Sequence, residues 1–487
     1  MTETGSQNLE SAETIAAVQP NAESLLRWHR RNSYYYSWLE RIYKFVVRPN
    51  SRVLDVGCEF GDLLAAVEPS YGVGIDSDGD AIELAKKRFS HLEFRTVDPH
   101  EMEINEKFDY VLICNSLGQW RDIQDVLERI HPATTESTRI VITYYNHFWE
   151  SVLRLGSWLR LRRPHSYQNW LPSKDIENLL GLSGFDVIRS DSFLLLPKRI
   201  WPFASICNYF LTLLPGFRFF NLVNLVVARP LPVACRDEDL SVSVIIPCRN
   251  ERGNVEDAIR RVPQMGRETE IIFVDGNSTD GTAEEIENQI KNHPERRISL
   301  IHQGDGVGKG DAVRKGFAAA EADVLVIQDA DLTAPPEDLP KFFRALCDGK
   351  GEYINGSRLV YPMEKQAMRF LNLLGNKFFG SLFSWLLGQR FRDTLCGTKM
   401  IRKKDYELIA NNRSYFGEFD PFGDFDLIFG AVKQNFKVVE VPVTYRARTY
   451  GSTNISRFRH GWLLLKMSWI AFKKIKWLGR ARDTKTN

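Results

Sequence analysis

The sequence predicts two α/β domains, each built on a doubly wound sheet. Its length of 487 residues is enough for two or three domains. Short apolar runs ending in glycine or aspartate recur in both halves and alternate with helix-like segments, as in sheets whose strands are joined by crossovers. A stretch rich in proline and charge, residues 231–240, separates the halves and is expected to be a linker.

The composition is that of a globular protein that buries large cores. Hydrophobic residues make up 43% and charged residues 26% of the chain. The net charge of +2 provides no basic field that would favour nucleic acid as a partner. The seven cysteines are scattered without a CxxC pair, which favours reduced thiols in a cytoplasmic protein without structural zinc. Residues 1–23 are polar and lack the apolar core of a signal peptide, so we expect a disordered tail.

Two segments bear on whether the chain meets a membrane, and neither is expected to cross one. Residues 201–217 are uncharged, but they are short for a span and contain two prolines, which favours burial or interfacial contact. Residues 456–487 predict a C-terminal helix in which tryptophan and lysine recur, a composition typical of the headgroup boundary. The alternative is a helix that packs on the preceding domain with its lysines in solvent. We expect peripheral contact with the cytoplasmic face of a membrane.

The first half begins with a nucleotide-binding pattern. A β-rich run, residues 52–57, ends at Gly57 and is followed by a turn containing Gly61 and then by a helical segment. The next predicted strand ends at Asp76, 19 residues after Gly57. Glycines let the backbone approach a ligand, and the acid accepts hydrogen bonds from ribose hydroxyls. Further strands, one of them leading to Asp98, are expected to complete a parallel sheet.

This segment resembles a class I S-adenosylmethionine-dependent methyltransferase, most clearly over residues 50–150, with the domain running from 24 to 230. The resemblance implies that the methyl donor is the cofactor. The residues that it places around S-adenosylmethionine are Asp55, Gly57, Gly61, Asp76 and Asp98.

One residue departs from the pattern of that family. Its first turn usually reads Gly-x-Gly-x-Gly, and here Glu59 replaces the middle glycine. Glutamate brings a bulky anion to the point where the backbone approaches the cofactor. A Glu59 side chain that points to solvent is compatible with an active methyltransferase. The alternative is a domain that has lost catalysis and serves as a scaffold. Nothing in the sequence identifies a methyl acceptor.

The second half shows the same pattern of predicted strands that end near acidic residues. One predicted strand ends at Pro247, with Glu251 opening the helix behind it, and the next ends at Asp275. Acids at the ends of adjacent parallel strands point into one crevice, where a base and ribose can be bound. A glycine-rich turn at 304–310 then carries Lys309, whose charge suits a diphosphate. Because glycine follows that lysine, where a Walker loop has serine or threonine, an ATPase is disfavoured.

An aspartate pair is the strongest signal in the chain. Asp329 and Asp331 follow the apolar run 323–327, which reads as a buried strand. Two carboxylates separated by one residue at the end of a strand can share a divalent cation. That cation can in turn hold the diphosphate of a nucleotide sugar.

Residues 241–455 resemble a family 2 glycosyltransferase of the GT-A fold, in particular the dolichyl- or polyprenyl-phosphate sugar transferases. The resemblance implies an inverting transfer of a hexose from a nucleotide-diphosphate sugar to a polyprenyl phosphate, with Mg²⁺ or Mn²⁺ at Asp329 and Asp331. It assigns donor binding to Pro247, Glu251, Asp275, Lys309, Gly310 and Arg314. The family often has glutamine where this chain has Thr333, whose hydroxyl is a weaker metal ligand, so a water would take that place.

The acceptor remains open between two classes. In the resembling enzymes, arginines at the positions of Arg358, Arg369 and Arg448 converge on the acceptor phosphate, which guanidinium groups bind in a bidentate manner. A sugar hydroxyl in a surface glycan would instead need a general base, and Asp424 lies 93 residues after Asp331, where such a base often falls. A phosphate is already anionic and needs no base. A third reading is a non-catalytic protein that only binds nucleotide or cofactor.

Overall fold

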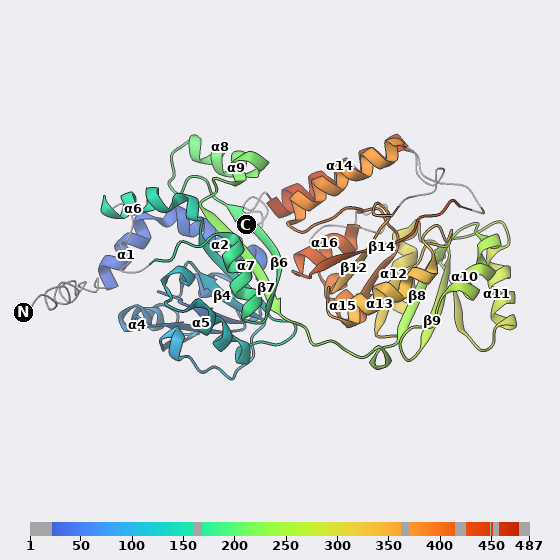
Figure 1. Ribbon diagram of the computed structural model, residues 1–487, viewed down its shortest axis with the longest axis horizontal. Helices are drawn as coiled ribbons and strands as arrows, with labels where there is room; N and C mark the ends of the chain where they lie inside the picture. Colours follow the sequence, from blue (N-terminus) through green and yellow to red (C-terminus); the bar gives the residue numbers. More distant parts are fainter. Residues whose placement is uncertain are drawn as a thin grey trace, which may run out of the picture. The chain divides into compact units, whose positions relative to one another are not determined.

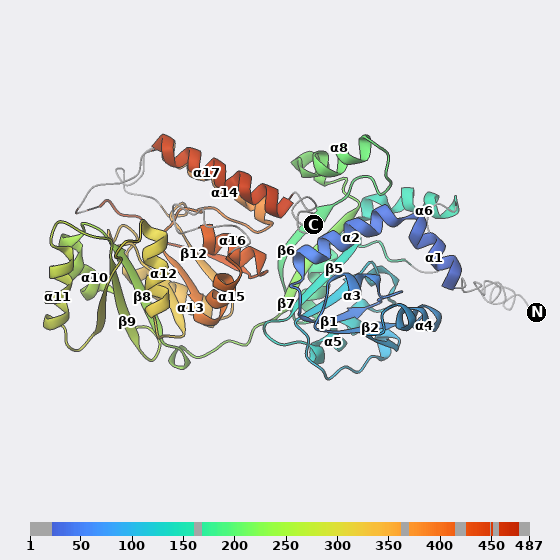
Figure 2. The same cartoon turned by 180° about the vertical axis from the view of Figure 1, so that it is seen from behind.

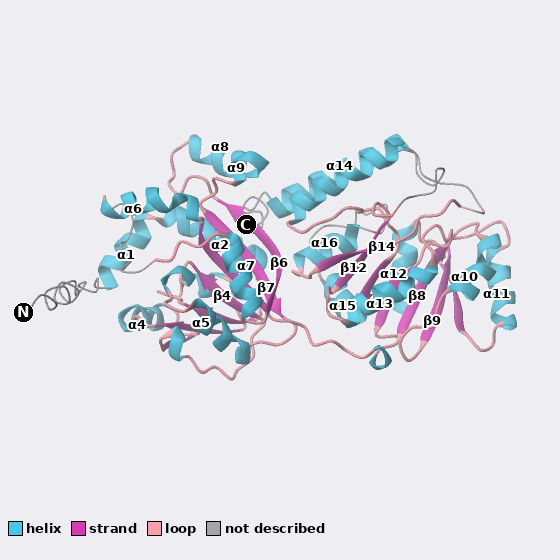
Figure 3. Cartoon of the chain, viewed as in Figure 1, coloured by secondary structure: helices cyan, strands magenta, loops and turns pink. Residues whose placement is uncertain are grey.

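The computed structural model describes residues 22–159, 168–361, 370–413, 425–448, 450 and 457–476 (Figure 1). The chain divides into two compact units, the first comprising Met1–Val187 and Asp191–Pro230, the second Ile188–Ser190 and Leu231–Asn487. Each unit is built on a seven-stranded sheet with helices beside it (Figure 3). The prediction of two α/β domains is therefore confirmed.

The sheet of the first unit has the strand order β3-β2-β1-β4-β5-β7-β6. Its strands are β1 (Arg52–Val56), β2 (Tyr71–Asp76), β3 (Glu93–Thr96), β4 (Tyr110–Cys114), β5 (Arg139–Tyr145), β6 (Phe185–Phe193) and β7 (Val223–Pro230). β1 to β5 pair in parallel, whereas β7 runs antiparallel to β5. The sheet is therefore mixed, and not purely parallel as the alternation of strands and helices suggested.

The helices of the first unit lie beside this sheet (Figure 2). They are α1 (Ala22–Arg31), α2 (Ser33–Val46), α3 (Asp62–Ala66), α4 (Gly79–Arg88), α5 (Ile123–Ile130), α6 (Glu150–Trp158), α7 (Ser173–Leu182), α8 (Phe203–Tyr209) and α9 (Pro215–Arg218). In α5, Ile123, Val126, Leu127 and Ile130 are all buried, which is the spacing of an amphipathic helix. The side chain of Asp122 caps it by accepting the N–H of Asp125.

The sheet of the second unit has the order β10-β9-β8-β11-β13-β12-β14. Its strands are β8 (Val242–Cys248), β9 (Thr269–Asp275), β10 (Arg297–His302), β11 (Val324–Ile327), β12 (Tyr353–Ser357), β13 (Lys399–Arg402) and β14 (Val438–Pro442). β13 is antiparallel to both β11 and β12, and the other pairs are parallel. This sheet is also mixed.

The second unit has a helix after most strands. These are α10 (Val255–Arg261), α11 (Thr282–Asn292), α12 (Lys309–Ala319), α13 (Leu339–Cys347), α14 (Phe370–Leu387), α15 (Lys403–Asn411), α16 (Phe425–Lys433) and α17 (Arg457–Ala471), which continues as the π-helix η10 (Phe472–Lys476). Within the described residues, no helix has the length and apolarity that a transmembrane span requires.

The strand orders determine where ligands can bind. In each sheet the order reverses beside one central strand, between β1 and β4 in the first unit and between β8 and β11 in the second. At such a reversal the connections leave to opposite faces, so a crevice opens at the carboxyl ends of the strands. The predicted residues Asp55 and Asp329 lie at these two points.

Candidate functional sites

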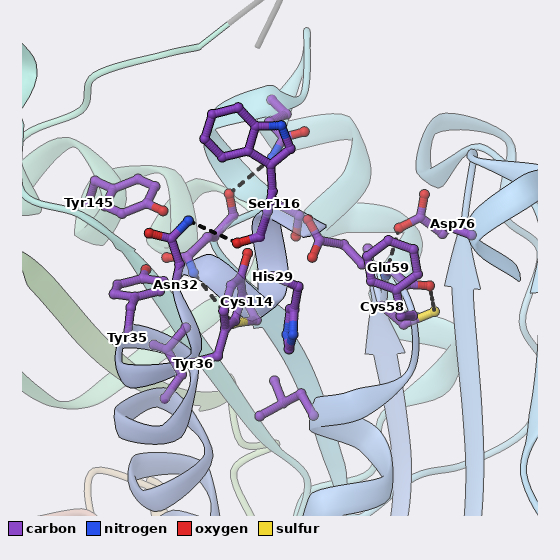
Figure 4. A pocket seen from close by; sticks show the side chains of 18 of the residues that line it. His29, Asn32, Tyr35, Tyr36, Cys58, Glu59, Asp76, Cys114, Ser116 and Tyr145 are labelled. Carbon is purple, nitrogen blue, oxygen red and sulfur yellow. Dashed lines mark hydrogen bonds between the residues drawn. The ribbon is translucent and has the colours of Figure 1, made fainter. Parts of the chain in front are cut away.

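A cavity of about 1170 Å³ opens at the carboxyl ends of β1, β2, β4 and β5 in the first unit (Figure 4). Four of the five residues predicted to surround the cofactor line it. They are Asp55, Gly57, Asp76 and Asp98. The volume is sufficient to hold a drug-sized ligand.

The two glycines of the first turn have different tasks. Gly57 has a φ of 82°, and a Cβ there would lie 2.6 Å from the Cβ of Ser116, so this position excludes any side chain. Gly61 has a φ of 74° and caps α3, and a Cβ there would come within 2.5 Å of the Phe94 ring. Gly61 does not line the cavity. It permits the close packing of α3 and β3, so its place in the structure differs from the predicted contact with the cofactor.

Glu59 adopts the backbone conformation that glycine usually provides. Its φ is 47°, in the left-handed region that a non-glycine residue enters at a cost. The N–H of Glu59 donates to Oδ2 of Asp76 at 2.9 Å, and the N–H of Asp78 donates to Oδ1 at the same distance. Asp76 therefore ties the turn to the end of β2. Glu59 is half-buried in the cavity wall and does not turn wholly to solvent.

Asp55 is a buried carboxyl that faces the cavity without a partner. It is 1% exposed, and neither of its oxygens accepts a hydrogen bond from a described residue. Burial, and after it the charges of Asp76 and Glu59, raise the pKa of Asp55 to about 8. A buried polar group without a hydrogen bond is costly. A cationic ligand group beside Asp55 would remove that cost.

The stability of the ligand-free protein is expected to fall as pH rises, because of Asp55. The folded pKa of about 8 lies above the ordinary value of 3.8, so the folded state holds a proton that the unfolded state has lost. The free energy of unfolding should drop by about 2 kcal/mol between pH 6 and pH 8 from this group alone. Thermal unfolding across this range should show a flatter profile for Asp55→Asn. Identical profiles for both proteins would contradict the assignment.

The opposite wall of the cavity comes from the N-terminal helices, which carried no recognised motif. His29 stacks on Tyr36 with ring centroids 3.8 Å apart, and Tyr35 stacks on Tyr145 at 6.0 Å. These side chains line the cavity beside Asn32 (Figure 4). The aromatic cluster around residues 28–36 was the only sequence signal for this wall.

Residues predicted for the second site converge at the end of β11. Nζ of Lys309 lies 2.7 Å from Oδ1 of Asp329. Arg448 donates to Oδ2 of Asp331 at 2.5 Å and lies 3.4 Å from Oε1 of Glu251. These contacts bring together five side chains from four separate segments of the sequence.

Basic side chains in this crevice influence the pKa values of Asp329 and Glu251. Burial would raise the pKa of Asp329, but Lys309, Lys399 and Arg358 hold it below the ordinary value. Burial raises the pKa of Glu251, while Arg448 opposes that change. The crevice therefore holds an ionised carboxylate with cations beside it, as charged phosphate chemistry requires.

The donor atoms of the aspartate pair suit a hard divalent cation. Thr333 adds a hydroxyl, which donates to Oδ1 of Asp331 at 2.9 Å, and its N–H donates to the same oxygen at 3.1 Å. Across the described part of the chain, however, no three His, Cys, Asp or Glu side chains are arranged to hold a metal ion. A cation here would rely on two carboxylates and on oxygens of the bound ligand.

Gly397 makes room for the Asp329 carboxylate. A Cβ at Gly397 would lie 2.0 Å from Oδ2 and 2.4 Å from Cγ of Asp329. This glycine precedes β13, and its role depends on an approach between segments 68 residues apart, which the sequence does not reveal.

Arg358 forms an ion pair within the protein, and its predicted contact with the acceptor phosphate stays a prediction. Its Nε and Nη2 donate to the two oxygens of Asp393 at 2.7 and 2.8 Å, and Asp393 is fully buried. The guanidinium also lies over the Tyr445 ring, 5.1 Å from the centroid. Burial would raise the pKa of Asp393, but Arg358 holds it below its ordinary value. The guanidinium group of Arg358 thus makes its bidentate pair with a carboxylate of the same protein.

The remaining residues predicted for the donor site lie on β8, β9 and α12. Asp275 is buried at the end of β9 and accepts the N–H of Ser278 at 3.3 Å. Pro247 is half-buried in β8, and Gly310 and Arg314 lie in the first turns of α12. Arg369 and Asp424 lie outside the described residues.

Two family models match the chain, one in each unit. Residues 27–190 match a model described as "Methyltransferase domain", and residues 243–409 match "Glycosyl transferase family 2". The chain carries a methyltransferase domain followed by a family 2 glycosyltransferase domain. Both resemblances drawn from the sequence motifs are therefore confirmed.

Two curated relatives that are sugar transferases by name each match under half of the chain. The dolichol-phosphate mannosyltransferase of Pyrococcus furiosus is 32% identical over 223 residues, which cover 44% of this chain and 59% of that enzyme. The polyprenol monophosphomannose synthase of Mycolicibacterium smegmatis is 29% identical, covering 44% of this chain and 80% of the synthase. The chain thus spans only about three fifths of the length of the Pyrococcus enzyme.

Among solved structures, an S-adenosylmethionine-dependent methyltransferase from Mesorhizobium loti is similar to this chain at a TM-score of 0.30 and 18% identity. The similarity covers 37% of this chain and 91% of that protein.

Proposed function

We propose that the glycosyltransferase domain transfers a hexose from a nucleotide-diphosphate sugar to a polyprenyl phosphate. The observation that supports this most is the convergence of Lys309, Asp329, Asp331 and Arg448 in one crevice. Carboxylates for a cation and two basic groups for phosphates occur together there. The names of the Pyrococcus and Mycolicibacterium relatives favour mannose as the sugar and a polyprenyl-type phosphate as the acceptor.

The acidic and basic residues of this site have different proposed roles. Asp329 and Asp331 would hold Mg²⁺ or Mn²⁺, which neutralises charge on the departing nucleotide when bound. Lys309 and Arg448, now paired with these carboxylates, would then turn to the donor diphosphate and the acceptor phosphate. Glu251 and Asp275 would bind the nucleoside through their carboxylates. The acceptor phosphate oxygen attacks the anomeric carbon directly, and no base is required.

Replacing Asp424 by asparagine distinguishes the two acceptor classes. With a polyprenyl phosphate, turnover of Asp424→Asn should stay within about threefold of wild type, because an anionic acceptor has no proton to lose. A sugar hydroxyl would need the base, and its removal should lower turnover about 100-fold or more. Product formation from radiolabelled donor measures both, with Asp426→Asn as the neighbouring control. A large loss in Asp424→Asn alone would contradict the phosphate mechanism.

For the methyltransferase domain we propose S-adenosylmethionine as the ligand of the cavity. The partnerless carboxyl of Asp55 fits a ligand that carries positive charge, and Asp76 lies at the strand end where ribose hydroxyls are bound. When bound, S-adenosylmethionine supplies an activated methyl group. Asp55 would hold the cationic part of the ligand, and the glycine turn would let the protein backbone approach the ligand closely.

Calorimetry of the full chain with S-adenosylmethionine tests that ligand. Wild type should bind, and Asp76→Ala should bind about tenfold to 100-fold more weakly, because both the ribose contact and the anchor of the Glu59 turn are lost. Glu59→Gly should bind at least as well as wild type. Absence of binding in both wild type and Glu59→Gly would retire the methyl-transfer proposal. Binding by Glu59→Gly alone would identify the glutamate as a block.

A further inference from the structure

An apolar surface covers one side of the methyltransferase domain. Among the described residues of this unit, every exposed large apolar side chain except Leu182 lies in one of two segments, residues 148–159 or 200–220. Trp158 and Trp201 are 78% and 83% exposed. We call residues 148–159 and 200–220 the aromatic surface; it comprises α6, α8, η5 (Leu211–Leu213), α9 and the segments that flank them.

The aromatic surface is continuous although its two segments are far apart in the sequence. The Phe148 ring lies 5.1 Å from the rings of both Phe219 and Phe220. Nε1 of Trp149 donates to the carbonyl of Phe220 at 2.8 Å. Figures 1 and 2 both show α6 and α8 on the same side of this unit.

Polar and apolar groups are inverted in this region. Asn208 and Asn221, only 4% and 0% exposed, point inward, while neighbouring aromatic side chains point outward. Oδ1 of Asn208 accepts the N–H groups of Leu195 and Leu196, and Nδ2 of Asn221 donates to the carbonyl of Ser192. The backbone beneath the surface is thus held by buried hydrogen bonds. A segment that buries its amides and exposes its aromatic rings fits an apolar surrounding better than water.

The charges of this region indicate whether a lipid surface or a protein partner covers it. Asp191 pairs with Arg218 and Glu150 pairs with Arg154, each at 2.6 Å. From Ser192 to Leu222 the chain contains no aspartate or glutamate, whereas Lys198 and Arg199 are basic. Tryptophan beside lysine and arginine is typical of residues at the level of lipid headgroups, where basic groups meet anionic lipids. A protein partner would need hydrogen-bonding groups at its rim. The outward side chains here offer mainly carbon.

We propose that the methyltransferase domain docks on a lipid bilayer with anionic headgroups through the aromatic surface. The helices α6 and α8 lie in the headgroup boundary and do not cross the bilayer. Val152, Leu155 and Leu159 belong to this surface and also line the cavity. The cavity therefore opens at the lipid boundary. This contact is separate from any contribution of the C-terminal helix α17.

Flotation of the full chain with vesicles tests this docking. Vesicles of phosphatidylcholine with phosphatidylglycerol are compared with phosphatidylcholine alone. Trp201→Glu/Phe203→Glu should lower partition onto the mixed vesicles about 30-fold or more, since two large apolar side chains no longer enter the boundary. Leu182→Glu, at an exposed leucine outside the aromatic surface, should partition as wild type does. Wild type should bind pure phosphatidylcholine more weakly.

Vesicle binding by Trp201→Glu/Phe203→Glu and by Leu182→Glu is measured again in proteins that also carry Trp462→Glu/Trp469→Glu. These two further substitutions remove exposed tryptophans of α17. The difference between Trp201→Glu/Phe203→Glu and Leu182→Glu should persist in this background. Circular dichroism establishes that each variant is folded. The proposal is overturned if the two variants partition equally in both backgrounds. It is also overturned if the aromatic surface mutations only dissociate a lipid-free oligomer in sedimentation and leave vesicle binding unchanged.

Discussion

Replacing Gly397 by alanine is expected to lower sugar transfer about 100-fold while the glycosyltransferase domain stays folded. The added Cβ would lie 2.0 Å from Oδ2 of Asp329, so the carboxylate must move away. Its contact with Lys309 would be lost, together with its alignment toward a cation. Steady-state kinetics should show the loss mainly in kcat, because the displaced carboxylate is proposed to hold the cation that stabilises the departing nucleotide.

A matched glycine provides the control. Gly375 lies in α14, and an added Cβ would meet no atom within 4 Å. Gly375→Ala should therefore retain the turnover and the melting temperature of wild type. If Gly397→Ala transfers sugar as fast as Gly375→Ala, the Asp329 carboxylate does not act in the position described.

Removing the carboxylate of Asp393 is expected to destabilise the glycosyltransferase domain by about 3–5 kcal/mol. Its two oxygens accept charged hydrogen bonds from Arg358, which is only 13% exposed, and they also accept backbone N–H groups. Asp393→Ala would leave a guanidinium buried without its partner. Chemical denaturation monitored by fluorescence measures this change in the free energy of unfolding.

An exposed ion pair serves as the reference. Arg260 lies 2.5 Å from Asp257 on the surface of α10, and Asp257→Ala should cost no more than about 1 kcal/mol. Arg358→Lys should lose stability and leave the KM for polyprenyl phosphate near the wild-type value. A normal stability combined with a large rise in that KM would show that Arg358 serves the acceptor, as the sequence resemblance implied.

Strand ends could be predicted from the sequence, and so could much of the crevice. Apolar runs ending in Asp275 or Asp329 determine which residues reach the carboxyl edge of a parallel sheet, because side chains there share one crevice. The antiparallel direction of β7 and β13 could not be predicted, because it depends on long connections that carry no local signal.

Contacts between distant segments explain the other differences. The pairing of Arg358 with Asp393 and the approach of Gly397 to Asp329 depend on how β12 and β13 are placed, which no local motif records. Similarly, His29 and Tyr36 precede the nucleotide-binding pattern and join the cavity only because α1 and α2 fold back over the strand ends.

The most direct test of the central claim is sugar transfer by the purified full chain. GDP- and UDP-sugars are screened with polyprenyl phosphate in the presence of Mg²⁺ or Mn²⁺. We expect a lipid-linked product from one donor, its loss on addition of excess chelator, and a reduction of about 1000-fold in Asp329→Asn and Asp331→Asn. Transfer at the wild-type rate by both variants, or at an undiminished rate under excess chelator, would contradict the proposed role of the aspartate pair.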